Sequence, residues 1–186
     1  MGNSFFYLQL GFKHILPFGF DHILFILCLF FSDSHLKSLL WQATAFTIAH
    51  SITLALAMCS SVSFPSFVVE PVIAFSIVVF SMGNIFSNKL PASRIILVFI
   101  FGLVHGMGFA GALKSLGLPE DQFFSSLLSF NIGVELAQIT IIFLAWFLLA
   151  KLFREKPWYR KRIVIPISAI IAVIAFYWTA ERIFFA

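Results

Sequence analysis

The chain has 186 residues, of which 61% are hydrophobic and only 11% are charged. Soluble domains contain about 45–50% apolar and about 25% charged residues, and a soluble core of this size could not bury so much apolar surface. The composition therefore excludes an ordinary soluble domain and indicates an integral membrane protein. The net charge of +4 does not indicate nucleic-acid binding, because half of the lysines and arginines lie in one short segment, residues 151–162.

Six apolar runs are long enough to cross a membrane, since about 20 helical residues span about 30 Å of hydrocarbon. In chain order they are residues 15–32, 38–59, 66–87, 93–113, 122–150 and 162–184. Short polar or proline-containing segments separate them. We therefore expect residues 1–186 to form a single all-α domain, a compact bundle of about six transmembrane helices.

The first run differs from the others because it contains Pro17 and Gly19, two residues that interrupt helices. The preceding residues 4–16 are rich in aromatic side chains, which are common at the membrane surface. We expect a short N-terminal helix that lies at the interface or forms the first part of a broken span.

The basic residues predict the orientation of the bundle, because lysine and arginine concentrate in cytoplasmic loops. The strongly basic segment 151–162 should therefore face the cytoplasm. Counting back, the connections that contain Lys37 and Lys89 fall on the same side. Both termini are then expected outside.

Three ionisable residues flank the interruption in the first run: His14, Asp21 and His22. An ionisable side chain at the centre of a span costs about 2.5–3.5 kcal/mol and needs a partner. An unbroken helix would place His14 and Asp21 on one face, whereas a fold-back at Pro17 and Gly19 would bring them together. The alternative without a ligand is a carboxylate–imidazole pair that caps the span.

Two further histidines lie inside apolar runs. His50 follows Thr47 by about one turn, which makes a polar stripe on an apolar helix. His105 lies in a GxxxG pattern that begins at Gly102 and permits close helix packing. Either histidine could form a hydrogen bond between helices, and Met107 could offer a soft sulfur, although we expect it chiefly to pack.

Two carboxylates complete the set of polar residues within the spans. Asn131, Glu135 and Gln138 share one helix face, as expected for residues that line a path. Glu70 precedes Pro71 near the start of its span, where a carboxylate can also simply favour the helix dipole.

Each of these residues has a structural explanation when taken singly. Together, four imidazoles and three carboxylates over five spans are costly unless they converge, and the mixture suits a borderline divalent metal such as nickel, cobalt or zinc. We expect convergence of His14, Asp21, His22, His50 and His105. We also expect a polar vestibule open to the outside and a closed, apolar cytoplasmic half.

Five segments carry a resemblance to a known family: FDHILFIL, AFTIAHSITLALA, VEPVIAFSIVV, FGLVHGMGFA and FNIGVELAQ. Together they resemble the HupE/UreJ family, small membrane proteins associated with hydrogenase and urease maturation and regarded as nickel or cobalt permeases. The family's His/Asp-His signature maps onto His14, Asp21 and His22 with one extra intervening residue. The second histidine and the acidic residue that better-known members have near the fourth-span motif are absent from HGMGFAGAL.

The resemblance implies a nickel or cobalt permease of a bacterial inner membrane, with zinc or copper as alternative ions. The expected partners are membrane lipids and the divalent ion; nucleic acid is not expected, and the sequence names no protein partner. The predicted metal set is His14, Asp21, His22, His50, His105, Glu70 and Glu135. The predicted path-lining residues are Thr47, Met107, Asn131 and Gln138.

Three other functions remain open, although transport is favoured over catalysis. The first is an intramembrane zinc hydrolase similar to alkaline ceramidases and adiponectin receptors, which a lipid-sized cavity beside the metal would favour. The second is a rhomboid-like protease, which lacks support because no GxSG motif is present. The third is a metal-binding membrane scaffold.

Overall fold

The computed structural model describes residues 2–33, 35–59, 65–87, 94–115 and 122–185. All regular structure within these ranges is helical, which confirms the predicted all-α class. Five helical stretches are long and apolar enough to cross a membrane, in agreement with the predicted spans to within a few residues. They are Leu36–Cys59, Ser66–Phe86, Arg94–Gly111, Phe123–Phe153 and Arg160–Phe184.

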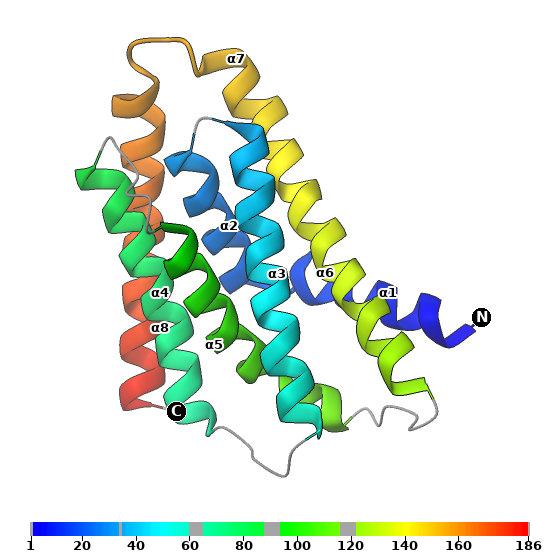
Figure 1. The fold of residues 1–186 in the computed structure, drawn as a ribbon. Helices are drawn as coiled ribbons and strands as arrows, with labels where there is room; N and C mark the ends of the chain where they lie inside the picture. Colours follow the sequence, from blue (N-terminus) through cyan, green and yellow to red (C-terminus); the bar gives the residue numbers. More distant parts are fainter. Residues whose placement is uncertain (1, 34, 60–64, 88–93, 116–121, 186) are drawn as a thin grey trace.

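These stretches form one bundle, shown in Figure 1. Three of its helices are α3 (Leu36–Cys59), α4 (Ser66–Phe86) and α5 (Arg94–Ser115). Helix α6 (Phe123–Ala145) continues through a π-helical turn into the short α7 (Lys151–Phe153). A second π-helical turn, Arg160–Val164, leads into α8 (Ile165–Phe184). The closest helix pairs are α3 with α5, α1 with α6, and α4 with α8.

The first predicted span, residues 15–32, is part of a bent pair of helices, as the interruption in the sequence suggested. Helix α1 (Gly2–Ile15) and helix α2 (Phe20–Ser32) meet at an angle of 69°. Helix α2 has 13 residues, or about 20 Å at 1.5 Å per residue, and cannot alone cross about 30 Å of hydrocarbon. The bend depends on Gly19, because a Cβ atom there would overlap the carbonyl oxygen of His14.

The bundle has two chemically different ends. The end that we call the basic end carries α7 and the connection from Lys151 to Arg162, together with the start of α3. The opposite end carries the end of α3 at Cys59, the start of α4 and the C-terminus of α8 (Figure 1). Which end faces the cytoplasm remains a prediction from the distribution of charge.

Buried polar side chains form hydrogen bonds near the basic end, which corrects the expectation of an apolar half. Arg94 is buried and its Nε donates to the side-chain oxygen of Gln42 at 3.1 Å, while Gln42 Nε2 donates to Asp33 Oδ2 at 3.0 Å. Asn84 and Arg94 both donate to the main-chain oxygen of Cys28. The sequence suggested apolar packing because Gln42 and Asn84 each lie within a largely apolar run, and Asp33 and Arg94 lie at the ends of such runs.

A glycine seam joins α3 to α5 and sets the position of both central histidines. A Cβ atom at Gly102 would overlap Phe46, and one at Gly106 would overlap the carbonyl oxygen of His50. Such close backbone approach is what small residues allow between membrane helices. The Thr53 hydroxyl crosses the same seam and donates to the carbonyl oxygen of Leu103 at 2.7 Å.

Replacement of Gly106 by alanine should destabilise the protein, because the new methyl group meets backbone that cannot move aside. We expect a loss of about 1–3 kcal/mol, the usual cost of overpacking. The matched control is Gly111→Ala on the same helix, where a Cβ atom meets nothing within 4 Å. Thermal unfolding in detergent should show a lower midpoint for G106A alone; equal midpoints for the two variants would contradict the seam.

Candidate metal centre

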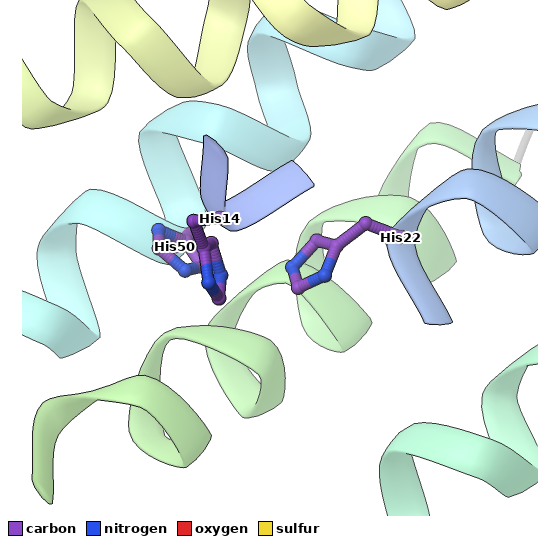
Figure 2. A group of neighbouring side chains, drawn as sticks. All are labelled: His14, His22 and His50. Carbon is purple, nitrogen blue, oxygen red and sulfur yellow. The ribbon is translucent and has the colours of Figure 1, made fainter. Parts of the chain in front are cut away.

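Three histidines from three helices meet inside the bundle. His14 lies in the last turn of α1, His22 near the start of α2, and His50 in the middle of α3. The ring centroids of His14 and His22 are 4.8 Å apart, and each of these rings is 6.1 Å from that of His50. One ring nitrogen from each of the three lies within 4.8 Å of the other two. Figure 2 shows the three rings turned toward one another.

His105 of α5 is the fourth member of the group. Its ring centroid is 5.1 Å from that of His22. Its Nδ1 atom lies 2.7 Å from the carbonyl oxygen of Phe101, so Nδ1 carries the proton and Nε2 keeps a free lone pair. We call His14, His22, His50 and His105 the histidine cluster. The convergence expected from the sequence is therefore found for all four membrane histidines.

The histidine cluster leaves an unusual number of polar atoms without partners. The buried atoms that lack a hydrogen bond to another described residue include Nε2 of His14, His22 and His105 and both ring nitrogens of His50. A buried polar atom without a partner costs about 1–3 kcal/mol. Neutral imidazole nitrogens are also the commonest protein ligands of transition metals. A bound divalent ion would satisfy several of these atoms at once.

The distances suit a metal centre after a small closure of the rings. Metal–nitrogen bonds to histidine are about 2.0–2.1 Å, so ligand nitrogens in a tetrahedral site lie roughly 3.4 Å apart. The observed upper limit of 4.8 Å is larger by an amount that side-chain rotation can remove. Three histidines and one further ligand, such as His105 or water, would complete four-coordination.

A large cavity reaches the histidine cluster from the end of the bundle opposite the basic end. Its volume is about 760 Å³, and His14, His22 and His105 line it. Most of its remaining wall is apolar, formed by Leu10, Phe18, Phe20, Ile73, Phe109 and Trp178. This cavity lies at the end where we expected the vestibule, and that this end faces outside remains a prediction. Its volume falls within the about 300–1,000 Å³ that is usual for ligand pockets.

Asp21 lines the same cavity but is paired with an arginine. Its two carboxylate oxygens lie 3.0 and 3.3 Å from Nη2 of Arg182 on α8. A second nitrogen of Arg182 donates to the main-chain oxygen of Glu70 at 3.1 Å. The bend that brings His14 next to His22 therefore does not place Asp21 in the same ligand group. A role for Asp21 in metal binding remains a prediction.

The two other carboxylates of the predicted set lie apart from the histidine cluster. The side chain of Glu70 is exposed at the cavity. Glu135 on α6 accepts hydrogen bonds from the hydroxyl groups of Thr44, at 2.6 Å, and of Thr47 on α3. Gln138 donates to the Thr47 hydroxyl at 3.0 Å. Glu135 thus belongs to a second polar group, about one helical turn from His50 along α3.

Asn131 lies between the histidine cluster and the polar group around Glu135. Met107 takes no part in either group. The Asn131 side chain is buried beside His50, donates to the carbonyl oxygen of Leu127 at 2.9 Å and leaves Oδ1 without a partner among the described residues. Thr47 and His50 lie one turn apart on α3. Met107 is half-buried and is not among the residues that line the large cavity.

Sequence reasoning missed two participants, Arg182 and Thr44. Arg182 lies two residues before the end of α8 at Phe184, and the predicted topology already placed that end on the same side as Asp21. The sequence therefore offered a signal for this ion pair: a positive and a negative side chain expected at the same membrane surface. No such signal existed for Thr44, because a single threonine in an apolar helix does not reveal whether it has a polar partner.

Comparison with known families decides the relationship. The family model described as HupE / UreJ protein matches residues 2–182. The chain belongs to the HupE/UreJ family. No match to a curated protein or to a solved structure was found. The match covers nearly the whole chain, beyond the five segments that carry the resemblance in the sequence.

The histidine cluster of this HupE/UreJ protein should bind one divalent transition-metal ion per chain. The His22→Ala variant should bind Ni²⁺ or Co²⁺ at least about tenfold more weakly, because even partners of direct ligands contribute about 10–100-fold. Isothermal titration calorimetry on the purified protein measures the affinity of each variant.

The control for this experiment is His35→Ala, which removes an exposed histidine outside the cluster. Its affinity should equal that of the unmodified protein. Equal weakening in the two variants would show that the ion binds elsewhere.

Proposed function

We propose that this protein is a nickel or cobalt permease of a bacterial inner membrane, with the histidine cluster as its ion-binding site. The observation that carries the proposal is the convergence of four imidazoles with buried nitrogens that lack partners among the described residues, three of which line a large cavity. Membership of the HupE/UreJ family, which is linked to nickel and cobalt, supports the choice of ion. Zinc and copper remain alternatives, since imidazole also suits them.

The cavity provides the route by which the ion would reach the histidines. Asp21 and Glu70 line it, and carboxylates at such a mouth attract divalent cations. Arg182 and Lys13 line it too, and their charges would repel an incoming cation. The ion pair of Arg182 with Asp21 offsets one of these charges, so the two cations and the two carboxylates leave the approach close to neutral.

The route beyond the histidine cluster would run between α3 and α6. Asn131 and Thr47 lead from His50 to Glu135, and Gln138 lies beside them. A carboxylate at this depth could accept the ion or a proton after the histidines release the ion. Thr47, Asn131, Gln138 and Glu135 therefore take the path-lining role in this proposal.

The second candidate function is an intramembrane zinc hydrolase. The observation in its favour is the 760 Å³ cavity with a mostly apolar wall, which could hold a lipid chain beside three histidines. Zinc bound by three protein ligands supplies an activated water as nucleophile. The substrate would be a membrane lipid with a hydrolysable amide or ester bond.

An uptake experiment separates ion transport from hydrolysis. Proteoliposomes that contain the protein should accumulate radioactive nickel or cobalt, and His50→Ala should abolish accumulation because it removes a central imidazole. Glu135→Gln should leave ion binding within about twofold but reduce uptake, since Glu135 lies outside the histidine cluster. His35→Ala serves as the control and should transport normally.

Two outcomes would contradict the permease. The first is no accumulation of nickel, cobalt, zinc or copper by the unmodified protein in sealed proteoliposomes. The second is retention of full uptake by His50→Ala. Zinc that stays bound through purification, together with release of fatty acid from membrane lipids, would instead support the hydrolase.

A further inference from the structure

A second cavity lies at the basic end, far along the bundle from the histidine cluster. Its volume is about 270 Å³, and it opens between the ends of α2 and α4 and the connection that follows α7. Its wall contains Arg154, Arg160, Asn84 and Tyr159. This connection joins two candidate spans that end at Phe153 and begin at Arg160, so the cavity lies at the level of the lipid headgroups.

Each of the two arginines forms one hydrogen bond to a main-chain carbonyl oxygen. Arg154 donates to the carbonyl oxygen of Asp33 at 2.8 Å, and Arg160 donates to that of Ile85 at 3.1 Å. Neither forms an ion pair within the part of the chain that the structure describes. A guanidinium group has five N–H donors in a rigid fork, so most donors of both arginines remain free for a ligand.

The one carboxylate in the wall, Asp33, is already compensated. Burial alone would raise the pKa of Asp33, but hydrogen bonds from Ser38 and from the main chain of His35 hold it below its ordinary value, helped by the charges of His35 and Arg94. Its Oδ2 accepts from Gln42, and its Oδ1 accepts from the main chain of His35. Asp33 is the only carboxylate among the lining residues, so the two arginines leave the wall with a net positive charge.

A second observation, independent of the arginines, also indicates a ligand: the unpaired side-chain oxygen of Asn84. Only 3% of this residue is exposed, and its Nδ2 donates to the carbonyl oxygen of Cys28 at 2.9 Å. Its Oδ1 atom is buried and has no hydrogen-bond partner among the described residues. A buried acceptor without a partner requires a donor such as a hydroxyl group.

We propose that this second cavity binds the phosphate group of an anionic phosphoester that also carries a hydroxyl group. Arg154 and Arg160 would bind the phosphate oxygens, and Asn84 Oδ1 would accept from the hydroxyl. The headgroup of phosphatidylglycerol has this chemistry and lies at this level of the membrane. Four exposed basic side chains on the same connection add a positive field: Lys151, Lys156, Lys161 and Arg162. The inference does not depend on metal transport.

Native mass spectrometry of the full chain in detergent tests the site. The protein should retain one phosphatidylglycerol per chain at concentrations where phosphatidylcholine is lost. Arg160→Gln should weaken this binding at least tenfold. The matched control is Arg162→Gln, which makes the same change two residues away on an exposed side chain outside the cavity. It should stay within twofold of the unmodified protein.

Equal weakening in the two variants, or no saturable binding, would overturn the site. Phosphatidylmethanol, which has the same charge but no headgroup hydroxyl, should bind more weakly, and equal affinity would overturn the role of Asn84. Competition by inorganic phosphate would identify free phosphate as the occupant, and its failure would identify the lipid. If Arg160→Gln does not fold, Arg160→Lys keeps the charge but loses the fork, and unchanged binding in that variant would contradict the site.

Discussion

The buried nitrogens of four imidazoles, which lack partners among the described residues, are the constraint on which the rest of this structure depends. An apolar bundle in a membrane offers few groups that could satisfy them, and each costs about 1–3 kcal/mol if it stays unpaired. The bent helix pair and the glycine seam bring the rings together without supplying hydrogen-bond partners for these nitrogens. An ion bound between these rings would accept the lone pairs of the nitrogens and remove this cost.

The backbone features that pack the helices closely also build the site. Gly19 permits the fold-back that brings His14 to His22, and Gly106 allows α5 to approach α3 at His50. Helices α1 and α6 also pack closely through glycines, because Cβ atoms at Gly11 and Gly133 would overlap the backbone of the facing helix. Close packing of backbone therefore supports a polar centre that an apolar bundle would otherwise avoid.

The sequence predicted the spans and the convergence of the histidines, because a polar group in an apolar run has few places to lie. It did not predict the partners of individual side chains. The helices are apolar on nearly every side, so no amphipathic pattern reveals how each is rotated about its axis. Three contacts depend on that rotation. They are the ion pair of Asp21 with Arg182, the hydrogen bond between Thr44 and Glu135, and the hydrogen bond from the buried Arg94 to Gln42.

X-ray absorption spectroscopy of the nickel- or cobalt-loaded protein tests the central claim most directly, because it reports the atoms bound to the ion. The account predicts at least three nitrogen ligands at about 2.0–2.1 Å, the usual range for histidine, with the outer-shell scattering of imidazole rings. The His35→Ala protein should give the same spectrum. A first shell made only of oxygen, without imidazole scattering, would contradict a metal centre formed by the histidine cluster.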